Sequence, residues 1–241
     1  MHMKRKTKWA AAAVCCLLLF FAGFAAIRTG VLFSGGNAAG ETQKTVIIDP
    51  GHGGADGGAV SADGTVEKGI NLDISLKLRD FLEAYGYRVI MTRDTDISIH
   101  DPSAKSIREQ KVSDLHNRLK IAEENPDAIF VSIHQNKFEV PKYCGTQTFY
   151  SPNNPQSTEL AKIIQGNIRG QLQPENAREV KKVGKEIYTL YHMKQTSVMV
   201  ECGFLSNPEE AKKLVQPEYQ DQLAFLIATS VAQYDASLIT Q

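Results

Sequence analysis

The feature that most limits the fold of this chain is a regular alternation of two kinds of segment between residues 45 and 236. Short runs rich in β-branched and aromatic residues, such as "TVIID" and "AIFVSI", are followed by longer segments with a helical apolar period. In the first long segment, Ile70, Ile74 and Leu78 fall on one helical face. A β–α alternation is typical of an α/β domain, because each helix returns the chain to start another strand. We predict one such domain over residues 45–239, with a parallel or mixed sheet flanked by helices.

The boundaries of these segments follow turn residues and breaks in the apolar pattern. We expect strands at 45–49, 87–92, 128–133, 146–150, 187–191 and 197–201. We expect helices at 67–86, 104–124, 156–172, 208–215 and 217–236. In α/β sheets the catalytic residues gather at the carboxyl ends of the strands, where loops can vary without disturbing the core.

The first 44 residues differ in composition from the α/β region. Residues 1–8 are basic, and residues 9–27 carry no charge over a length that can span a bilayer. Residues 28–44 are rich in small and polar residues and lack a regular period, which is typical of a linker. Two alternatives stay open: an uncleaved signal anchor with its basic flank in the cytoplasm, or a signal peptide cleaved near the weak site "NAAGE". Both predict export of the α/β domain, either anchored to the outer face of the membrane or secreted to the cell wall.

The charge balance disfavours one class of function. The chain has 27 lysine and arginine residues and 27 aspartate and glutamate residues. Five of the basic residues and none of the acidic ones precede residue 41, which leaves 22 basic and 27 acidic residues, a net charge of −5, in the exported part. Because there is no basic surplus to neutralise phosphates, nucleic-acid binding is not expected.

The exported part contains two cysteines, Cys144 and Cys202. They could form one disulfide outside the membrane, or they could remain two free buried thiols. The sequence leaves both alternatives open, and neither cysteine lies in a recognisable nucleophile motif.

Polar side chains follow three of the predicted strands. His52 comes after "VIIDPG", His134 after "FVSI", and Glu201 at the end of "VMVE", while a fourth group, Glu67, opens the first long helix. Glycines on both sides of His52 leave room for an ion or a ligand. Two histidines and one carboxylate are the usual protein ligands of a hydrolytic zinc site, which keeps a fourth position for water. A second carboxylate beside such a site can accept the proton of that water and pass it to the leaving amine, which is the role we expect for Glu201.

Three of these residues also have a purely structural explanation. Glu67 could only stabilise the start of the helix, where free amides favour negative charge. His134 could be a hydrogen-bonded core histidine, as is common after an apolar strand. Glu201 could simply pair with an arginine such as Arg93 or Arg118.

Five motifs occur in an order that points to a family. They are "IIDPGHGGADGGA", "EKGINLDIS", "VIMTRDTD", "FVSIHQN" and "VECGFLSNP", between residues 46 and 208. In these motifs the chain resembles the zinc-dependent N-acetylmuramoyl-L-alanine amidases of the amidase-3 type. The resemblance implies an α/β domain with a six-stranded mixed sheet and one Zn²⁺ held by His52, Glu67 and His134, with Glu201 as the catalytic carboxylate. The implied reaction is hydrolysis of the amide between N-acetylmuramic acid and the L-alanine of the peptidoglycan stem peptide.

Within this family the chain is most similar to the spore-cortex amidases of the CwlD type. The resemblance implies removal of stem peptides on the way to muramic δ-lactam, together with a separate muramic acid deacetylase, between forespore and mother cell. An activating protein partner stays open, and a vegetative wall amidase (autolysin) is the alternative. We expect Asn71, Arg93 and Asn136 to line the substrate groove or to support the metal ligands. One departure from many relatives, Gln135 in place of alanine, bears on subtype and touches no ligand position.

Other kinds of protein are less consistent with the motifs. A zinc carboxypeptidase or a polysaccharide deacetylase also uses histidine and carboxylate ligands, but neither requires "ECGFLSN" after the last strand. A non-catalytic wall-binding scaffold would be expected to have lost at least one of His52, Glu67, His134 and Glu201, and none is missing.

Overall fold

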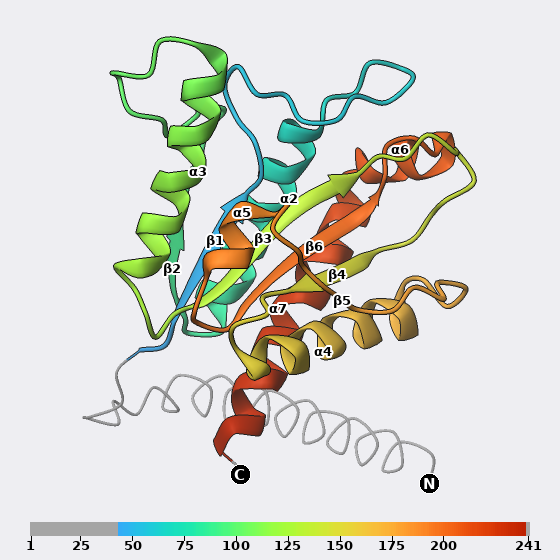
Figure 1. Cartoon of the computed structure of the whole chain (residues 1–241). Helices are drawn as coiled ribbons and strands as arrows, with labels where there is room; N and C mark the ends of the chain where they lie inside the picture. Colours follow the sequence, from blue (N-terminus) through green and yellow to red (C-terminus); the bar gives the residue numbers. More distant parts are fainter. Residues whose placement is uncertain (1–42, 240–241) are drawn as a thin grey trace, which may run out of the picture. The chain divides into compact units, whose positions relative to one another are not determined.

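Six strands form one mixed sheet in the order β2-β1-β3-β6-β4-β5 (Figure 1). The computed structural model describes residues 43–239. The strands are β1 (Thr45–Pro50), β2 (Arg88–Met91), β3 (Ile129–Asn136), β4 (Gln147–Tyr150), β5 (Lys181–Lys182) and β6 (Ser197–Phe204). All neighbouring pairs are parallel except β4 and β6, which are antiparallel. The predicted α/β class and the six-stranded mixed sheet are therefore confirmed.

Helices cover both faces of the sheet (Figure 1). The helices are α2 (Glu67–Ala84), α3 (Ile107–Glu123), α4 (Pro155–Gln171), α5 (Tyr188–His192), α6 (Pro208–Leu214) and α7 (Pro217–Ile239). Because successive side chains of a strand point to opposite faces, Val46 and Ile48 of β1 pack with α2, α4 and α7, while Ile47 packs on the side of α3 and α5. The core thus consists of two apolar layers separated by the sheet.

Helix α3 attaches to the sheet through buried charged groups as well as apolar ones. Its fully buried residues are Asp114, Arg118 and Ala122, whereas α2 buries a row of isoleucines and leucines. The helix begins with a complete capping box between Ser106 and Glu109, which satisfies free amides at its start. Ion pairs of Arg118 with Asp49 and Asp114 therefore add to the apolar packing of this helix on the sheet.

One predicted strand is wrong. The segment 187–191, "IYTLY", lies in the short helix α5, and the strand at that edge of the sheet is β5, which pairs with β4 in parallel. A short apolar run fits a strand and a buried helical turn equally well, so its period cannot separate the two. The two lysines of β5 carry no alternation of apolar and polar side chains that would have predicted a strand.

The N-terminal predictions fall outside the part of the chain that the structure describes. This holds for the basic segment 1–8, the apolar segment 9–27 and nearly all of the linker 28–44. Within residues 43–239, no helix has the length and the apolar character needed to cross a membrane.

Candidate metal centre

The sheet order brings the predicted polar residues to one edge of the fold. Strands β1, β3 and β6 are neighbours, and their carboxyl ends carry His52, His134 and Glu201. In the register of the sheet, Pro50 lies beside Ile133, and His134 lies directly beside Glu201. Register neighbours in a sheet direct their side chains to the same face, so residues far apart in the sequence share one site.

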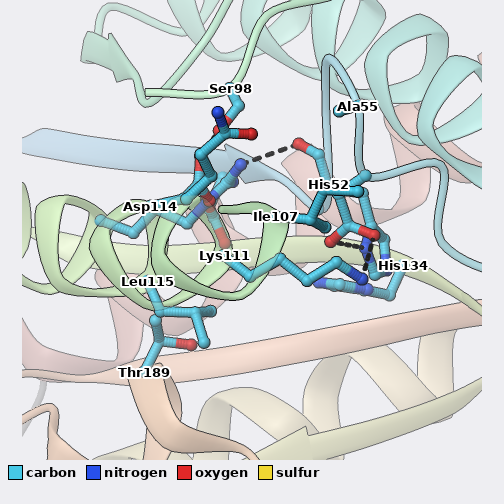
Figure 2. Close-up of a pocket in the computed structure, with 14 residues that line it drawn as sticks. His52, Ala55, Ser98, Ile107, Lys111, Asp114, Leu115, His134 and Thr189 are labelled. Carbon is cyan, nitrogen blue, oxygen red and sulfur yellow. Dashed lines mark hydrogen bonds and ion pairs between the residues drawn. The ribbon is translucent and has the colours of Figure 1, made fainter. Parts of the chain in front are cut away.

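A cavity of about 200 Å³ opens beside this strand edge (Figure 2). His52 and His134 line one side of it, and α3 contributes Ile107 and Lys111. Helix α5 adds Thr189. The two histidines are therefore accessible to a ligand that enters between the loop after β1 and α3.

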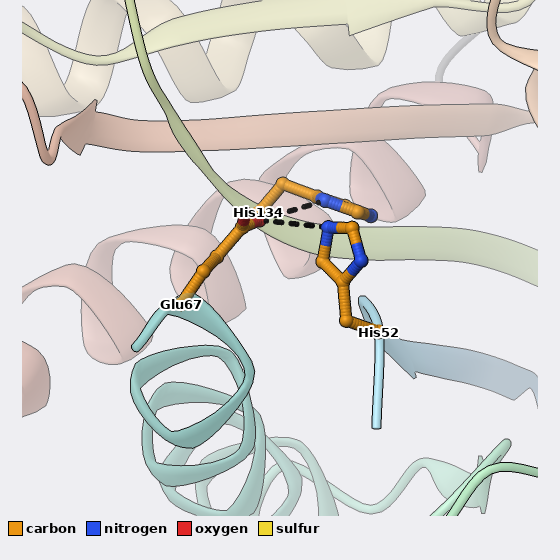
Figure 3. Close-up of side chains that lie close together, drawn as sticks. All are labelled: His52, Glu67 and His134. Carbon is orange, nitrogen blue, oxygen red and sulfur yellow. Dashed lines mark hydrogen bonds and ion pairs between the residues drawn. The ribbon is translucent and has the colours of Figure 1, made fainter. Parts of the chain in front are cut away.

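Glu67 meets both histidines at its carboxylate (Figure 3). Its Oε1 atom lies 3.3 Å from Nε2 of His52 and 3.0 Å from Nδ1 of His134. One ligand atom from each of the three residues lies within 4.8 Å of the others, and the two imidazole rings are 5.0 Å apart and nearly perpendicular. Two nitrogens and one carboxylate oxygen form a donor set that suits Zn²⁺.

Two backbone amides outside its own helix and one side chain within that helix hold the Glu67 carboxylate. Although Glu67 is the first residue of α2, its Oε2 accepts from the amide of Ala59, and its Oε1 accepts from the amide of Gln135 and the side chain of Asn71. Burial alone would raise the pKa of this carboxyl, but hydrogen bonds and charge from His134 and His52 hold the pKa well below its usual range. The carboxylate is therefore charged and directed at the two imidazoles, which goes beyond a role in stabilising the helix start.

Glycines allow the three ligands to come together. A Cβ atom on Gly51 would lie 2.2 Å from the His134 ring, and one on Gly58 would lie 2.5 Å from Oε2 of Glu67 and 2.6 Å from the His52 ring. His52 itself has a φ of 62°, a backbone region that non-glycine residues rarely adopt. The loop thus combines absent side chains at two positions with one strained histidine, a combination that is typical of a functional site.

The surroundings of His52 make its imidazole more basic. Burial lowers the pKa of His52, but the carboxylates of Glu67 and Asp56 outweigh burial and raise this pKa to about 9. A carboxylate partner on one ring nitrogen makes the other nitrogen a better electron-pair donor to a metal once the imidazole has lost its extra proton.

The other predicted residues occupy three different places. Asn71 is fully buried under Glu67 and also donates to the carbonyl of Gly51. Arg93 is buried and donates to the carbonyls of Pro50 and Gly51, so it supports the backbone of the loop. Asn136 is half-buried at the end of β3, where its backbone carbonyl accepts from the amide of Leu205.

A buried ionic cluster below the loop was not foreseen from the sequence. Arg118 of α3 pairs with Asp49 and Asp114 and also donates to the carbonyl of His52, at 2.7 Å. The hydroxyls of Thr92 and Ser132 donate to the Asp49 carboxylate. The only signal in the sequence is the spacing of Asp114 and Arg118, four residues apart on an otherwise polar helix, and that spacing is common on exposed helices.

Replacement of Arg118 by methionine is expected to lower the free energy of unfolding by about 3–5 kcal/mol, because it leaves the buried Asp49 charge without its partner. The matched control is Arg79→Met, which breaks an exposed pair with Asp80 and is expected to cost less than about 1 kcal/mol. Urea unfolding of both variants measures the difference. Equal losses of unfolding free energy would show that the buried pair stabilises the fold no more than the exposed pair does.

The same cluster predicts how stability depends on pH. Burial raises the pKa of Asp49, but Arg118 and the two hydroxyls outweigh burial and hold the pKa below its ordinary value of 3.8. A carboxyl with a lowered folded-state pKa stabilises the protein fully above its unfolded-state pKa, and this stabilisation is lost as the pH falls through the folded-state value. We expect urea unfolding to show that stability falls as the pH drops below about 4, with a smaller loss in Asp49→Asn. An identical pH dependence in the two proteins would contradict this role.

One oxygen of the buried Glu201 carboxylate lacks a hydrogen-bond partner in the part of the chain that the structure describes. Its Oε2 atom is buried and has no hydrogen-bond partner among the described residues, and the arginines considered as partners, Arg93 and Arg118, bind elsewhere. Burial raises the pKa of Glu201 to about 7. The charge of His134 lowers this pKa, and the negative charge of Glu67 raises it. A carboxyl with this pKa can both accept and donate a proton at neutral pH.

Both cysteines of the described region are free thiols. Cys144 is exposed and Cys202 is buried beside Glu201, so the disulfide alternative is not formed in this structure. Burial raises the pKa of the Cys202 thiol far above neutrality, which keeps it protonated and unreactive.

Comparisons with known proteins agree with this geometry. Residues 46–233 match the family described as N-acetylmuramoyl-L-alanine amidase. The chain is 35% identical to the germination-specific N-acetylmuramoyl-L-alanine amidase of Bacillus subtilis (strain 168). The 191 aligned residues cover 79% of each protein. The CwlD amidase from Clostridioides difficile, solved in complex with the GerS lipoprotein, has a similar fold, with a TM-score of 0.78 and 42% identity over 81% of this chain and 100% of that one.

A second solved structure supports the same assignment. The N-acetylmuramoyl-L-alanine amidase from Clostridium difficile 630 has a TM-score of 0.71 and 31% identity, over 82% of this chain and 99% of that one. A family match over most of the chain, together with these relatives, shows that the chain belongs to the Amidase_3 family of N-acetylmuramoyl-L-alanine amidases, enzymes that hydrolyse an amide bond of peptidoglycan.

Proposed function

We propose that this chain is a zinc-dependent amidase that cleaves the bond between the lactyl group of N-acetylmuramic acid and the L-alanine of the stem peptide. The observation that carries the proposal is the convergence of His52, Glu67 and His134 next to Glu201, which is the register neighbour of His134 and has one buried carboxylate oxygen without a partner. His52, Glu67 and His134 would hold the ion, and Glu201 would move the proton.

The residues fit Zn²⁺ on their own chemistry. The ligand atoms are two imidazole nitrogens and one ionised carboxylate oxygen within 4.8 Å of one another, and glycines leave the space between them free of side chains. When bound, Zn²⁺ would act as a Lewis acid that acidifies water and polarises the substrate carbonyl. Closed structural zinc sites have four protein ligands, whereas this set has three and adjoins a cavity.

Glu201 is suited to proton transfer. Its pKa of about 7 leaves it ionised in a large fraction of molecules at neutral pH, so it can accept the proton of the attacking water. The same residue can then donate that proton to the nitrogen of the leaving L-alanine, which must be protonated to depart as an amine. The cavity beside His52 and His134 offers space for the substrate, and we propose that Asn136 lies along the groove while Asn71 and Arg93 support the ligands from below.

We further propose a role in the spore cortex, on the way to muramic δ-lactam and in germination. The likeness to the germination-specific amidase and to the CwlD amidase supports this substrate over a vegetative wall. A separate muramic acid deacetylase would then act on the product. The CwlD amidase was solved with a lipoprotein, which supports a protein partner for this chain as well. We also propose that residues 9–27 direct export, that residues 28–44 are a linker, and that residues 45–239 are the catalytic domain.

The products of peptidoglycan digestion test the reaction. The full chain, stripped of metal with a chelator and then supplied with Zn²⁺, is incubated with purified peptidoglycan. We expect new L-alanine amino termini only after zinc is added. Free D-alanine would instead indicate a carboxypeptidase, released acetate a deacetylase, and binding without any product a scaffold. The cortex assignment is tested by muramic δ-lactam in spores of a strain without this protein, where we expect it to be absent.

A further inference from the structure

The ring of His52 is fixed at both of its nitrogens. Nε2 faces Glu67, and Nδ1 lies 2.9 Å from Oδ2 of Asp56, so a proton on Nδ1 is donated to that carboxylate. When the imidazole is neutral, this contact leaves Nε2 as the nitrogen with a free electron pair. Only the unprotonated nitrogen of a neutral imidazole can bind a metal. Because the Asp56 carboxylate favours the proton on Nδ1, it favours the tautomer in which Nε2 can bind the ion.

Asp56 is itself held in place from two sides. Two backbone hydrogen bonds with Gly53, of 3.0 and 3.1 Å, close the loop between His52 and Asp56 into a tight turn. The second carboxylate oxygen of Asp56 lies 2.8 Å from Nζ of Lys111, which reaches it from α3. The Asp56 carboxylate therefore forms a bridge between a helix and a metal-ligand candidate.

Helix α3 reaches His52 at a second point. Arg118, seven residues after Lys111, donates to the backbone carbonyl of His52 at 2.7 Å. Helix α3 thus contacts the backbone of His52 directly and the ring of His52 through Asp56.

We propose that Asp56 is a positioning residue that sets the tautomer and orientation of His52 for zinc, and that Lys111 holds Asp56 in this position. The inference rests on the proposed zinc site. Outer partners of metal ligands of this kind contribute about 10–100-fold to metal affinity.

The expected result for Asp56→Asn is zinc affinity weaker by about 10–100-fold, measured by competition with a chromogenic chelator. The matched control is Asp96→Asn, which removes the same charge from a residue bound to the amide of Gly54 in the same loop, without contact to His52. We expect the control to bind zinc within about 3-fold of the wild type, as is usual for an exposed charge. The absorption spectrum of bound Co²⁺ should change in Asp56→Asn only, because it reports on ligand geometry.

Lys111→Met gives a test in which a positioning role and a simple charge effect predict opposite changes in zinc affinity. Removal of a positive charge near a cation site should tighten zinc binding by Coulomb attraction alone, whereas loss of the Asp56 anchor should weaken binding, by about 2–5-fold for a half-exposed pair. We expect weaker binding, and near-normal binding in Lys111→Arg. Tighter binding in Lys111→Met, or equal affinities in Asp56→Asn and Asp96→Asn, would overturn the inference. A wild-type chain that binds no zinc would instead refute the proposed function on which it rests.

Discussion

Replacement of Glu201 by glutamine is expected to lower kcat by about 10²–10⁴-fold, the usual contribution of general acid–base catalysis. Glutamine keeps the shape of the side chain but can neither accept the proton of water nor deliver one to the leaving amine. Because Glu201 is outside the group of three ligand candidates, zinc content should stay at the wild-type level. The rate of formation of L-alanine amino termini and the metal content of the same sample measure the two effects separately.

A neighbouring carboxylate serves as the control. Glu210 lies near the same end of β6 and accepts from the amides of Gly145 and Phe204, so its carboxylate has a structural role. Glu210→Gln should retain activity within about 10-fold of the wild type, since only structural hydrogen bonds are weakened. If Glu201→Gln were as active as this control, the proton-transfer role would be wrong.

Replacement of His52 by alanine is expected to remove zinc and activity while the fold is retained. One of the three proposed ligands is lost, so affinity should fall by more than the roughly 10–100-fold that an outer partner contributes. The backbone contact from Arg118 to the carbonyl of residue 52 does not need the imidazole, which is why the loop should persist. Zinc at 100 times its Kd should stabilise the wild type by about 2.7 kcal/mol and should not measurably stabilise the variant at that concentration.

Thermal unfolding with and without zinc measures this difference. His100→Ala is the matched control, since His100 bonds to Ser98 and is not one of the three grouped ligand candidates. The control should be stabilised by zinc as the wild type is. If zinc stabilised His52→Ala to the same extent, His52 would not be a ligand.

Most of the fold could be predicted from the sequence because its strands and helices have clear periods. The helix predicted at 67–86 is α2, and the apolar strand before His134 is β3. The last strand of the sheet was mispredicted because strand pairing there depends on tertiary contacts. The two lysines of β5 form a strand only because β4 lies beside them. The segment 187–191, predicted as a strand, instead contributes to helix α5, whose Leu190 is buried in the core.

The sequence by itself determined the residues available for chemistry. His52, Glu67, His134 and Glu201 stand at strand ends or a helix start, and parallel strands bring their carboxyl ends to one edge. The glycines after β1 also indicated a loop that a ligand can approach.

Only the tertiary structure decided how those residues are held. Arg93 was expected near the substrate or the ligands, and it proves to be a backbone support, while Arg118 of α3 joins Asp49 to the carbonyl of His52. Asp56 gains its importance from a single 2.9 Å contact that fixes one nitrogen of His52. Such roles depend on side-chain orientation and on contacts between distant segments, and a local pattern in the sequence constrains neither.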